Sequence, residues 1–197
     1  MFRRKILPLA IAAVLATGAA SAVFASHGNS DDRQEAAAAQ SATVSLAQAV
    51  AAAEKHSSGY AISAGMEQKR GTFRYQVKTL TKDRESEILI DPTTGAVIGT
   101  QREGVVERLL EREDRAELAK LQSGKTTLAG AISAAEQASG GKAFEAAFEN
   151  ENGTAGFQIE VAKNGGTQRF LVEAATGKVV SLAASDQDEE HEDEHED

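Results

Sequence analysis

Residues 88–98 read Ile-Leu-Ile-Asp-Pro-Thr-Thr-Gly-Ala-Val-Ile, and residues 170–180 read Phe-Leu-Val-Glu-Ala-Ala-Thr-Gly-Lys-Val-Val. Each stretch contains an apolar run, an acidic residue, a Thr-Gly turn and a second apolar run, which is typical of two strands joined by a turn. The two stretches lie 82 positions apart, and the same offset aligns Leu46–Val50 with Leu128–Ile132. One gapless offset for strands, turns and a helical stretch indicates that a small unit has been duplicated.

Each unit begins with the pattern of an amphipathic helix. Apolar residues recur at positions i, i+3, i+4 and i+7 from Leu46 in the first unit and from Leu128 in the second. Ser45 and Gln48 form a capping-box pattern at the start of the first helix, and Thr127 stands at the position of Ser45 in the second unit. Beyond each helix the apolar period changes to two, which predicts strands.

The order of these elements predicts an α+β fold with two repeated modules. In each module, one helix packs on a three- to four-stranded antiparallel sheet, because a helix with one apolar stripe and a sheet with one apolar face can bury each other. The first module spans residues 43–101 and the second spans residues 125–183, with a charged helical connector over residues 102–124 between them. We expect the modules to be separate domains that superpose at the offset of 82.

The first 25 residues have the pattern of a secretory signal peptide. Three basic residues at 3–5 precede the apolar run Ile6–Leu15, and small residues then offer cleavage after Ala22 or after Ala25. The apolar run is too short to cross a bilayer, which takes roughly 20 residues. The segment contains no Cys, which excludes a lipoprotein. The expected location is therefore the periplasm or the medium outside the cell.

Two further segments lie outside the modules. Residues 26–42 are small, polar and rich in Ala, which predicts a flexible spacer with room for a helical turn or two. Residues 184–197 contain nine of the 30 acidic residues together with two His, which predicts a disordered acidic tail. Without the signal peptide and the tail, the body carries 18 basic and 21 acidic residues. This near-neutral balance argues against nucleic-acid binding, which needs a concentrated basic surface.

The sequence offers little reaction chemistry. It contains no Cys, which excludes disulfides, Cys-ligated zinc and thiol catalysis. Residues 191–195 fit the His-Glu-x-x-His pattern of zinc peptidases, but that chemistry needs both His on one face of a packed helix, and no apolar residue follows Ala184. We therefore expect only weak binding of a divalent transition metal in the tail. Its ligands would be His191, His195, Glu192 and Glu194.

The order of a helix, strands, an acidic residue and a Thr-Gly turn resembles the PepSY domain. The repeated motif residues are Asp91, Thr94 and Gly95 in the first copy and Glu173, Thr176 and Gly177 in the second. Glu173 departs from the family pattern, which usually has Asp at that position. The resemblance implies propeptide-like modules of exported bacterial proteins, a role in restraining peptidases, and neither a catalytic residue nor a cofactor.

These observations predict a non-catalytic exported protein that binds a protein partner in the cell envelope and restrains a peptidase. The expected contact surface is the open sheet edge of each module, where a partner segment can add as a strand. It includes the hairpins at residues 69–72, 82–85, 150–154 and 163–167. The charged connector Val105–Leu121 is the alternative surface. Two other functions stay open: metal response or buffering through the tail, and a structural or signalling role in the envelope.

Overall fold

The computed structural model describes residues 30–82, 85–102, 119, 121, 123–151 and 154–182 of the 197-residue chain. The elements within these residues are α1 (Ser30–Ser41), α2 (Leu46–Ser57), β1 (Tyr60–Lys69), β2 (Thr72–Leu80), β3 (Glu85–Ile90), β4 (Val97–Arg102), α4 (Leu128–Ser139), β5 (Lys142–Glu151), β6 (Thr154–Lys163), β7 (Gly166–Glu173) and β8 (Val179–Leu182). Helices α2 and α4, strands β1 and β5, and strands β4 and β8 begin at positions 82 apart. The predicted α+β class and the predicted repeat are therefore confirmed.

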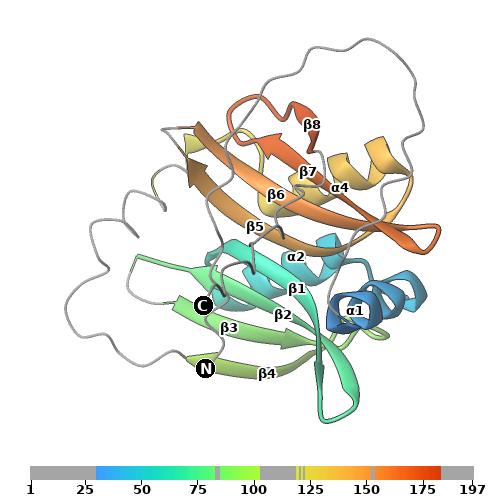
Figure 1. The fold of residues 1–197 in the computed structure, drawn as a ribbon. Coiled ribbons are helices and arrows are strands. Elements are labelled where there is room, and N and C mark those ends of the chain that lie inside the picture. The colour runs from blue at the N-terminus through green and yellow to red at the C-terminus, as the bar shows by residue number, and fades with distance from the viewer. Residues whose placement is uncertain are drawn as a thin grey trace, which may run out of the picture.

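The two modules do not have separate sheets, as the sequence predicted, because they share one sheet. Eight antiparallel strands follow the order β4-β3-β2-β1-β5-β6-β7-β8 (Figure 1). The modules meet where β1 pairs with β5, through Ser63 with Ala147, Ala64 with Ala146, and Gly65 with Glu145. Two isolated four-stranded sheets would each leave unpaired backbone groups along the β1 or β5 edge. Their pairing satisfies such groups in the central part of both strands, and it leaves β4 and β8 as the strands of the described sheet with a single neighbour.

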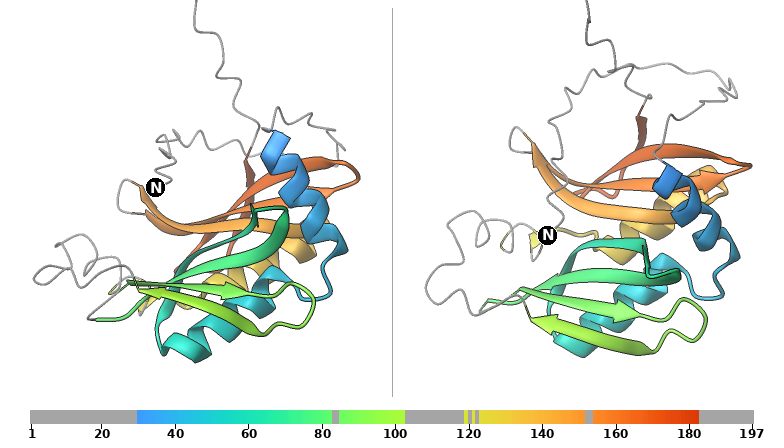
Figure 2. Two further views of the ribbon diagram at one scale, coloured as in Figure 1. Left: turned by 90° about the horizontal axis from the view of Figure 1, so that it is seen from below. Right: turned by 60° about the horizontal axis from the view of Figure 1, so that its bottom comes forward.

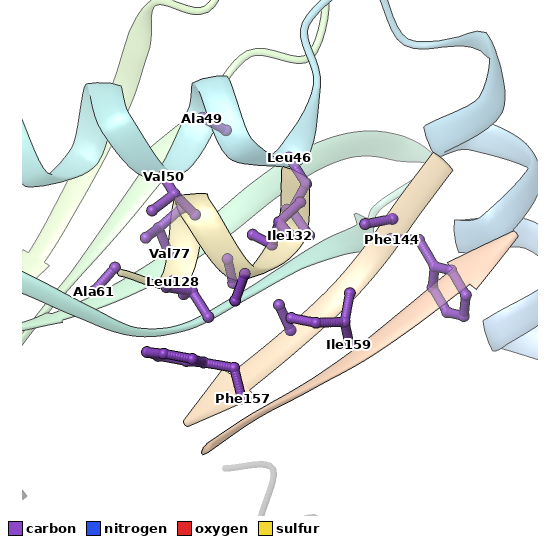
Figure 3. Packing of buried hydrophobic residues seen from close by; sticks show 14 of the residues in the cluster. Leu46, Ala49, Val50, Ala61, Val77, Leu128, Ile132, Phe144, Phe157 and Ile159 are labelled. Carbon is purple, nitrogen blue, oxygen red and sulfur yellow. The ribbon is translucent and has the colours of Figure 1, made fainter. Parts of the chain in front are cut away.

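The core is also shared between the modules. Helices α2 and α4 pack against each other on the same face of the sheet (Figure 2). One buried cluster contains apolar side chains from both helices and from the strands beneath them. The residues of this cluster that are labelled in Figure 3 are Leu46, Ala49, Val50, Ala61, Val77, Leu128, Ile132, Phe144, Phe157 and Ile159. Burial of each large aliphatic or aromatic side chain contributes roughly 1.5–3 kcal/mol to stability.

Local sequence explains where the two helices begin and end. The Ser45 hydroxyl accepts the Gln48 N–H at 3.2 Å and the Gln48 side chain accepts the Ser45 N–H at 2.9 Å, so the predicted capping box is present. Thr127 caps α4 by accepting the N–H of Gly130 at 3.2 Å. Gly140 then ends α4 with φ of 69°, a left-handed conformation that Gly adopts without a steric penalty.

Residues 30–41 differ from the predicted flexible spacer, because they form helix α1. Ala36 and Ala39 are buried in the shared core, and α1 packs on β1, β5 and β6 across the junction of the modules. Ala has the highest helix propensity, and its small side chain lets the helix lie close to the sheet. Leu121 lies 82 positions after Ala39 and is also buried. The structural repeat therefore starts before the capped helices.

Several predicted segments lie outside the described residues. They are the signal peptide, most of the connector over residues 102–124, and the acidic tail. In the connector, the described residues 119, 121 and 123 are helical. None of the described helices is long and apolar enough to cross a membrane.

Candidate functional site

The motif residues of the first module build a turn between β3 and β4. One oxygen of the Asp91 carboxylate accepts the N–H groups of Thr93 at 2.9 Å and Thr94 at 2.8 Å, and the hydroxyl of Thr94 at 3.1 Å. Gly95 has φ of 73° and donates its N–H to the Asp91 carbonyl at 2.9 Å. The backbone N–H of Thr94, then that of Thr93, and then the Thr94 hydroxyl lower the pKa of Asp91, since each stabilises the carboxylate. The acid closes the turn.

The second module repeats this turn with a longer acid. The Thr176 hydroxyl donates to the Glu173 carboxylate at 2.8 Å, and Gly177 has the same φ of 73° as its counterpart. The Glu173 N–H donates to the Lys178 carbonyl at 3.0 Å, which keeps the two strands in register. The motif residues therefore lie where the sequence predicts, but in two separate turns and not in one site.

A second repeated acid holds each helix to its sheet. The Glu54 side chain accepts the N–H of Ala61 at 2.9 Å, and the Glu136 side chain accepts the N–H of Ala143 at 2.9 Å. Both N–H groups lie at the irregularity where β1 and β5 shift register against their neighbours. Sequence reasoning gave these two acids no role, although both recur at the offset of 82. That recurrence of a polar residue was the available signal.

Among the described residues of the first module, Tyr75 is the most deeply buried ionisable group, with 1% of its surface exposed. Its hydroxyl donates to the carbonyl of Val44 at 2.7 Å, which ties the chain before α2 to β2. Burial, and then the negative charge of Glu136, raise the pKa of Tyr75 to about 12. Phe157 is its counterpart and lacks the hydroxyl. Tyr75 is therefore a neutral structural hydrogen-bond donor at physiological pH.

Within the described sheet, each module has one edge strand rather than two, because β1 and β5 pair with each other at their centres. The edge strands expose apolar side chains: Val97 is 37% exposed, Ile98 55% and Val180 36%. Among the described residues, Tyr60 is the only other large apolar side chain with comparable exposure. Ile98 and Val180 are counterparts in the repeat, so the exposed apolar position is itself duplicated.

The predicted contact hairpins lie at both ends of the sheet. Because β1 and β5 are antiparallel, the hairpin after β1 and the hairpin after β5 lie at opposite ends of the sheet. The first contains Arg70 with φ of 52° and Gly71 with φ of 78°, and the β6–β7 hairpin contains Asn164 with φ of 51° and Gly165 with φ of 80°. Residues 83, 84, 152 and 153, at the tips of the other two hairpins, lie outside the described residues.

A shallow groove runs between α2 and α4 on the outer side of the helix pair. Its lining includes the repeat counterparts Ala47 and Ala129, together with Gly130 and the amine-bearing Lys142. Small side chains and one lysine do not form a set of nucleophile, base and orienting group.

The predicted metal ligands of the tail, at residues 191–195, lie outside the described residues. Within the described part of the chain, no three His, Asp or Glu side chains are grouped so that they could hold a metal ion. The predicted weak metal binding of the tail stays a prediction.

A match to one protein family covers both copies of the repeated turn and helix. The family model described as the peptidase propeptide and YPEB domain, PepSY, matches residues 43–101 and 127–182. A crystal structure of a candidate lipoprotein from Clostridium difficile 630 is 19% identical, covers 71% of this chain and 91% of its own, and has a TM-score of 0.45. No curated protein matches the chain. The two family matches cover more than half of the residues, and the chain therefore belongs to the PepSY family and contains two PepSY domains.

Proposed function

We propose that this protein is a non-catalytic exported protein that binds a protein partner in the cell envelope and restrains a peptidase by contact. The proposal rests on the structural role of the polar residues that recur in both modules. Asp91 and Glu173 close turns, and Glu54 and Glu136 anchor helices to strands. The polar residues that the two copies share therefore hold the fold together, and we assign the function to the surface of that fold.

The family supports both parts of this proposal. PepSY domains are generally non-catalytic, and the family description names peptidase propeptides. A propeptide acts on its peptidase by binding it, and the proposal assigns the same kind of contact to this pair of domains. The signal peptide pattern of residues 1–25 supports a location in the periplasm or outside the cell.

The proposal is tested with the purified mature protein and the peptidases secreted by its own source. The protein alone should leave casein and fluorogenic peptides uncut, with or without added zinc. Added in increasing amounts to each purified peptidase, it should lower the rate of cleavage of a fluorogenic peptide to a plateau.

The matched control is the variant Val50→Asp, which places a charge at a fully buried core position and unfolds the scaffold without changing the rest of the surface sequence. Equal inhibition by this variant would point to simple competition by an unfolded substrate. Cleavage by the purified wild-type protein itself would contradict the proposal.

A further inference from the structure

We propose that two copies of this chain form a dimer by exchanging modules, so that β1 of each copy pairs with β5 of the other. The exchanged contact is the one between the modules, which we call the seam. It consists of residues 63–65 of β1 with residues 145–147 of β5, and of α2 against α4 (Figure 1). The partner is a second copy of this chain, and the inference goes beyond the proposed function. Such an exchange uses only contacts that a single chain already makes.

The two sides of the seam come from separate stretches of the chain. One side is formed by α1, α2 and β1, within residues 30–69, and the other by α4, β5 and β6, within residues 128–163. The two stretches are joined through the connector over residues 102–124. The same residues can therefore meet within one chain or between two chains.

An open seam would be a strong binding surface. Ala64 and Ala146 face each other at its centre, and they are 3% and 1% exposed. Opening would expose both residues, unpair the centre of both strands, and remove β5 and β6 from α1. The structure itself shows what covers each side, because the first module fits the second and the second fits the first. A second copy supplies both of these surfaces.

Pairing of unlike strands is favoured over pairing of like strands. Because counterpart residues face each other in the seam, β5 could also align with β5 of a second copy about Ala146. That alignment would put the two Glu145 carboxylates on one face of the sheet as diagonal neighbours, about 7–8 Å apart, where like charges repel. In the seam, the uncharged Ser63 stands in place of the second Glu145.

Concentration decides between the closed monomer and the exchanged dimer. Both forms contain the same seam contacts, so they differ mainly in whether a chain meets its own second module or that of another chain. Short linkers hold two joined units at effective concentrations on the order of millimolar. The closed monomer should therefore dominate at micromolar concentration, and the dimer should hold about half of the chains near about 1 mM.

Exchange should be slow in the folded protein. One buried cluster contains residues of both modules, so the seam cannot open without loss of the core. The dimer should therefore form when chains fold together, and it should persist after dilution. Each eight-stranded sheet is rebuilt in the dimer, so each surface of the fold is present twice.

Cysteine substitutions show which strands meet, because the chain contains no Cys. Ser63 and Ala147 face each other across the seam and are half-buried. The Cα atoms of facing residues in antiparallel strands lie about 4.5–5.5 Å apart, a distance that a disulfide spans. Ser63→Cys and Ala147→Cys are made as separate variants of the mature chain, mixed in equal amounts, unfolded in urea and refolded together. Dilution to micromolar concentration before oxidation avoids random crosslinks.

Refolding at about 1 mM should give a disulfide-linked dimer with one copy of each variant, seen by non-reducing electrophoresis and mass spectrometry. Refolding at about 1 µM should lower the yield of this dimer by about a hundredfold or more. Variants that are refolded separately and mixed afterwards should not crosslink. The background control is Ala51→Cys, which lies on the exposed side of α2.

Two further measurements complete the test. Ala64→Cys alone reports pairing of like strands, because a β1–β1 seam would bring residue 64 of both copies together; it should give no more dimer than Ala51→Cys. The wild type needs no Cys: after refolding at about 1 mM and dilution, gel filtration should show a persistent dimer with the circular dichroism spectrum of the monomer.

Each outcome decides the proposal. A wild type that is only monomeric after refolding at millimolar concentration would overturn the exchange. A dimer in which Ser63→Cys and Ala147→Cys do not crosslink would also overturn it, and self-crosslinking of Ala64→Cys would assign the dimer to pairing of like strands instead. None of these measurements uses a peptidase, so their failure is distinguishable from failure of the proposed function.

Discussion

Ala64 in β1 pairs with Ala146 in β5, and each of these residues is the other's counterpart in the repeat. The flanking pairs are exchanged in the same way, since Ser63 lies opposite Ala147 and Gly65 lies opposite Glu145. Antiparallel pairing of equivalent strands about one central pair requires a local two-fold axis between the modules. The duplication has therefore produced, within one chain, the geometry of a symmetric dimer.

Enlarging either central residue should destabilise the protein by a similar amount. Ala64 is 3% exposed and Ala146 is 1% exposed, and both lie in the shared core. Ala64→Leu and Ala146→Leu should each cost about 1–3 kcal/mol of unfolding free energy through overpacking. Urea denaturation measures this cost, with Ala51→Leu on the exposed side of α2 as the control. A large cost for only one of the two would contradict the equivalence of the two positions.

The shared core predicts a single unfolding transition. Phe157 is fully buried and its ring lies 5.5 Å from that of Phe148 in an edge-to-face arrangement. Phe157→Ala should lower the free energy of unfolding by about 3–5 kcal/mol, and it should destabilise both modules together. Thermal melts followed by circular dichroism should shift as one transition. The control Tyr60→Ala removes a ring that is 41% exposed, and a split transition in the Phe157 variant would show independent modules.

The turn at Asp91 should make stability depend on pH. The hydrogen bonds of the turn lower the pKa of Asp91 in the folded state, so the ionised carboxylate stabilises the protein at pH values above the unfolded pKa of about 3.9. This stabilisation is lost as the pH falls through the pKa of Asp91 in the folded state. Asp91→Asn should therefore be less stable than the wild type at pH 7. The difference should narrow as the pH falls below about 4. Urea denaturation of both proteins at several pH values measures the difference in their midpoints. A difference in midpoint that stays constant with pH would refute the stabilising role of the Asp91 carboxylate.

The anchor between α4 and β5 should depend on one acceptor oxygen. Glu136→Ala leaves the Ala143 N–H without its acceptor and should cost about 1–3 kcal/mol. Glu136→Gln keeps an oxygen at the same place and should recover most of this loss. Chemical denaturation compares the two variants. Equal losses in both would mean that the charge of Glu136, and not its hydrogen bond, stabilises the fold.

The tail should bind metal weakly and without affecting the fold. Most free imidazole is neutral at pH 7, because free His has a pKa of about 6.5, and carboxylates are ionised, so the tail offers both as ligands. Calorimetry with Zn²⁺ or Cu²⁺ should give micromolar or weaker binding in the mature protein. Truncation after Ala184 should abolish it, with no change in thermal stability. Undiminished binding after truncation would place the metal site elsewhere.

Local features of the fold could be predicted from the sequence because they depend on neighbouring residues. The cap at Ser45 and the turn at Asp91 each form within four residues, through hydrogen bonds that the residue types themselves specify. The apolar stripe from Leu46 predicted the buried face of α2 for the same reason.

Features that depend on distant contacts could not be predicted. Ala64 and Ala146 carry no sign that they will meet, since small apolar residues suit many buried environments. The role of Glu54 depends on a strand irregularity at Ala61 that a regular alternation does not reveal. Helix α1 could not be predicted from its composition, because Ala36 and Ala39 are stabilised by a surface that strands of both modules form.

Helix α1 is synthesised well before some of the strands on which it packs. The helix leaves the ribosome early, but its buried side rests in part on β5 and β6, which follow roughly one hundred residues later. At translation rates of about 5–20 residues per second, the segment waits roughly 5–20 seconds for its docking surface. During that interval the first module cannot reach its final state. Folding of the first module is therefore completed only after β5 and β6 of the second module have been made.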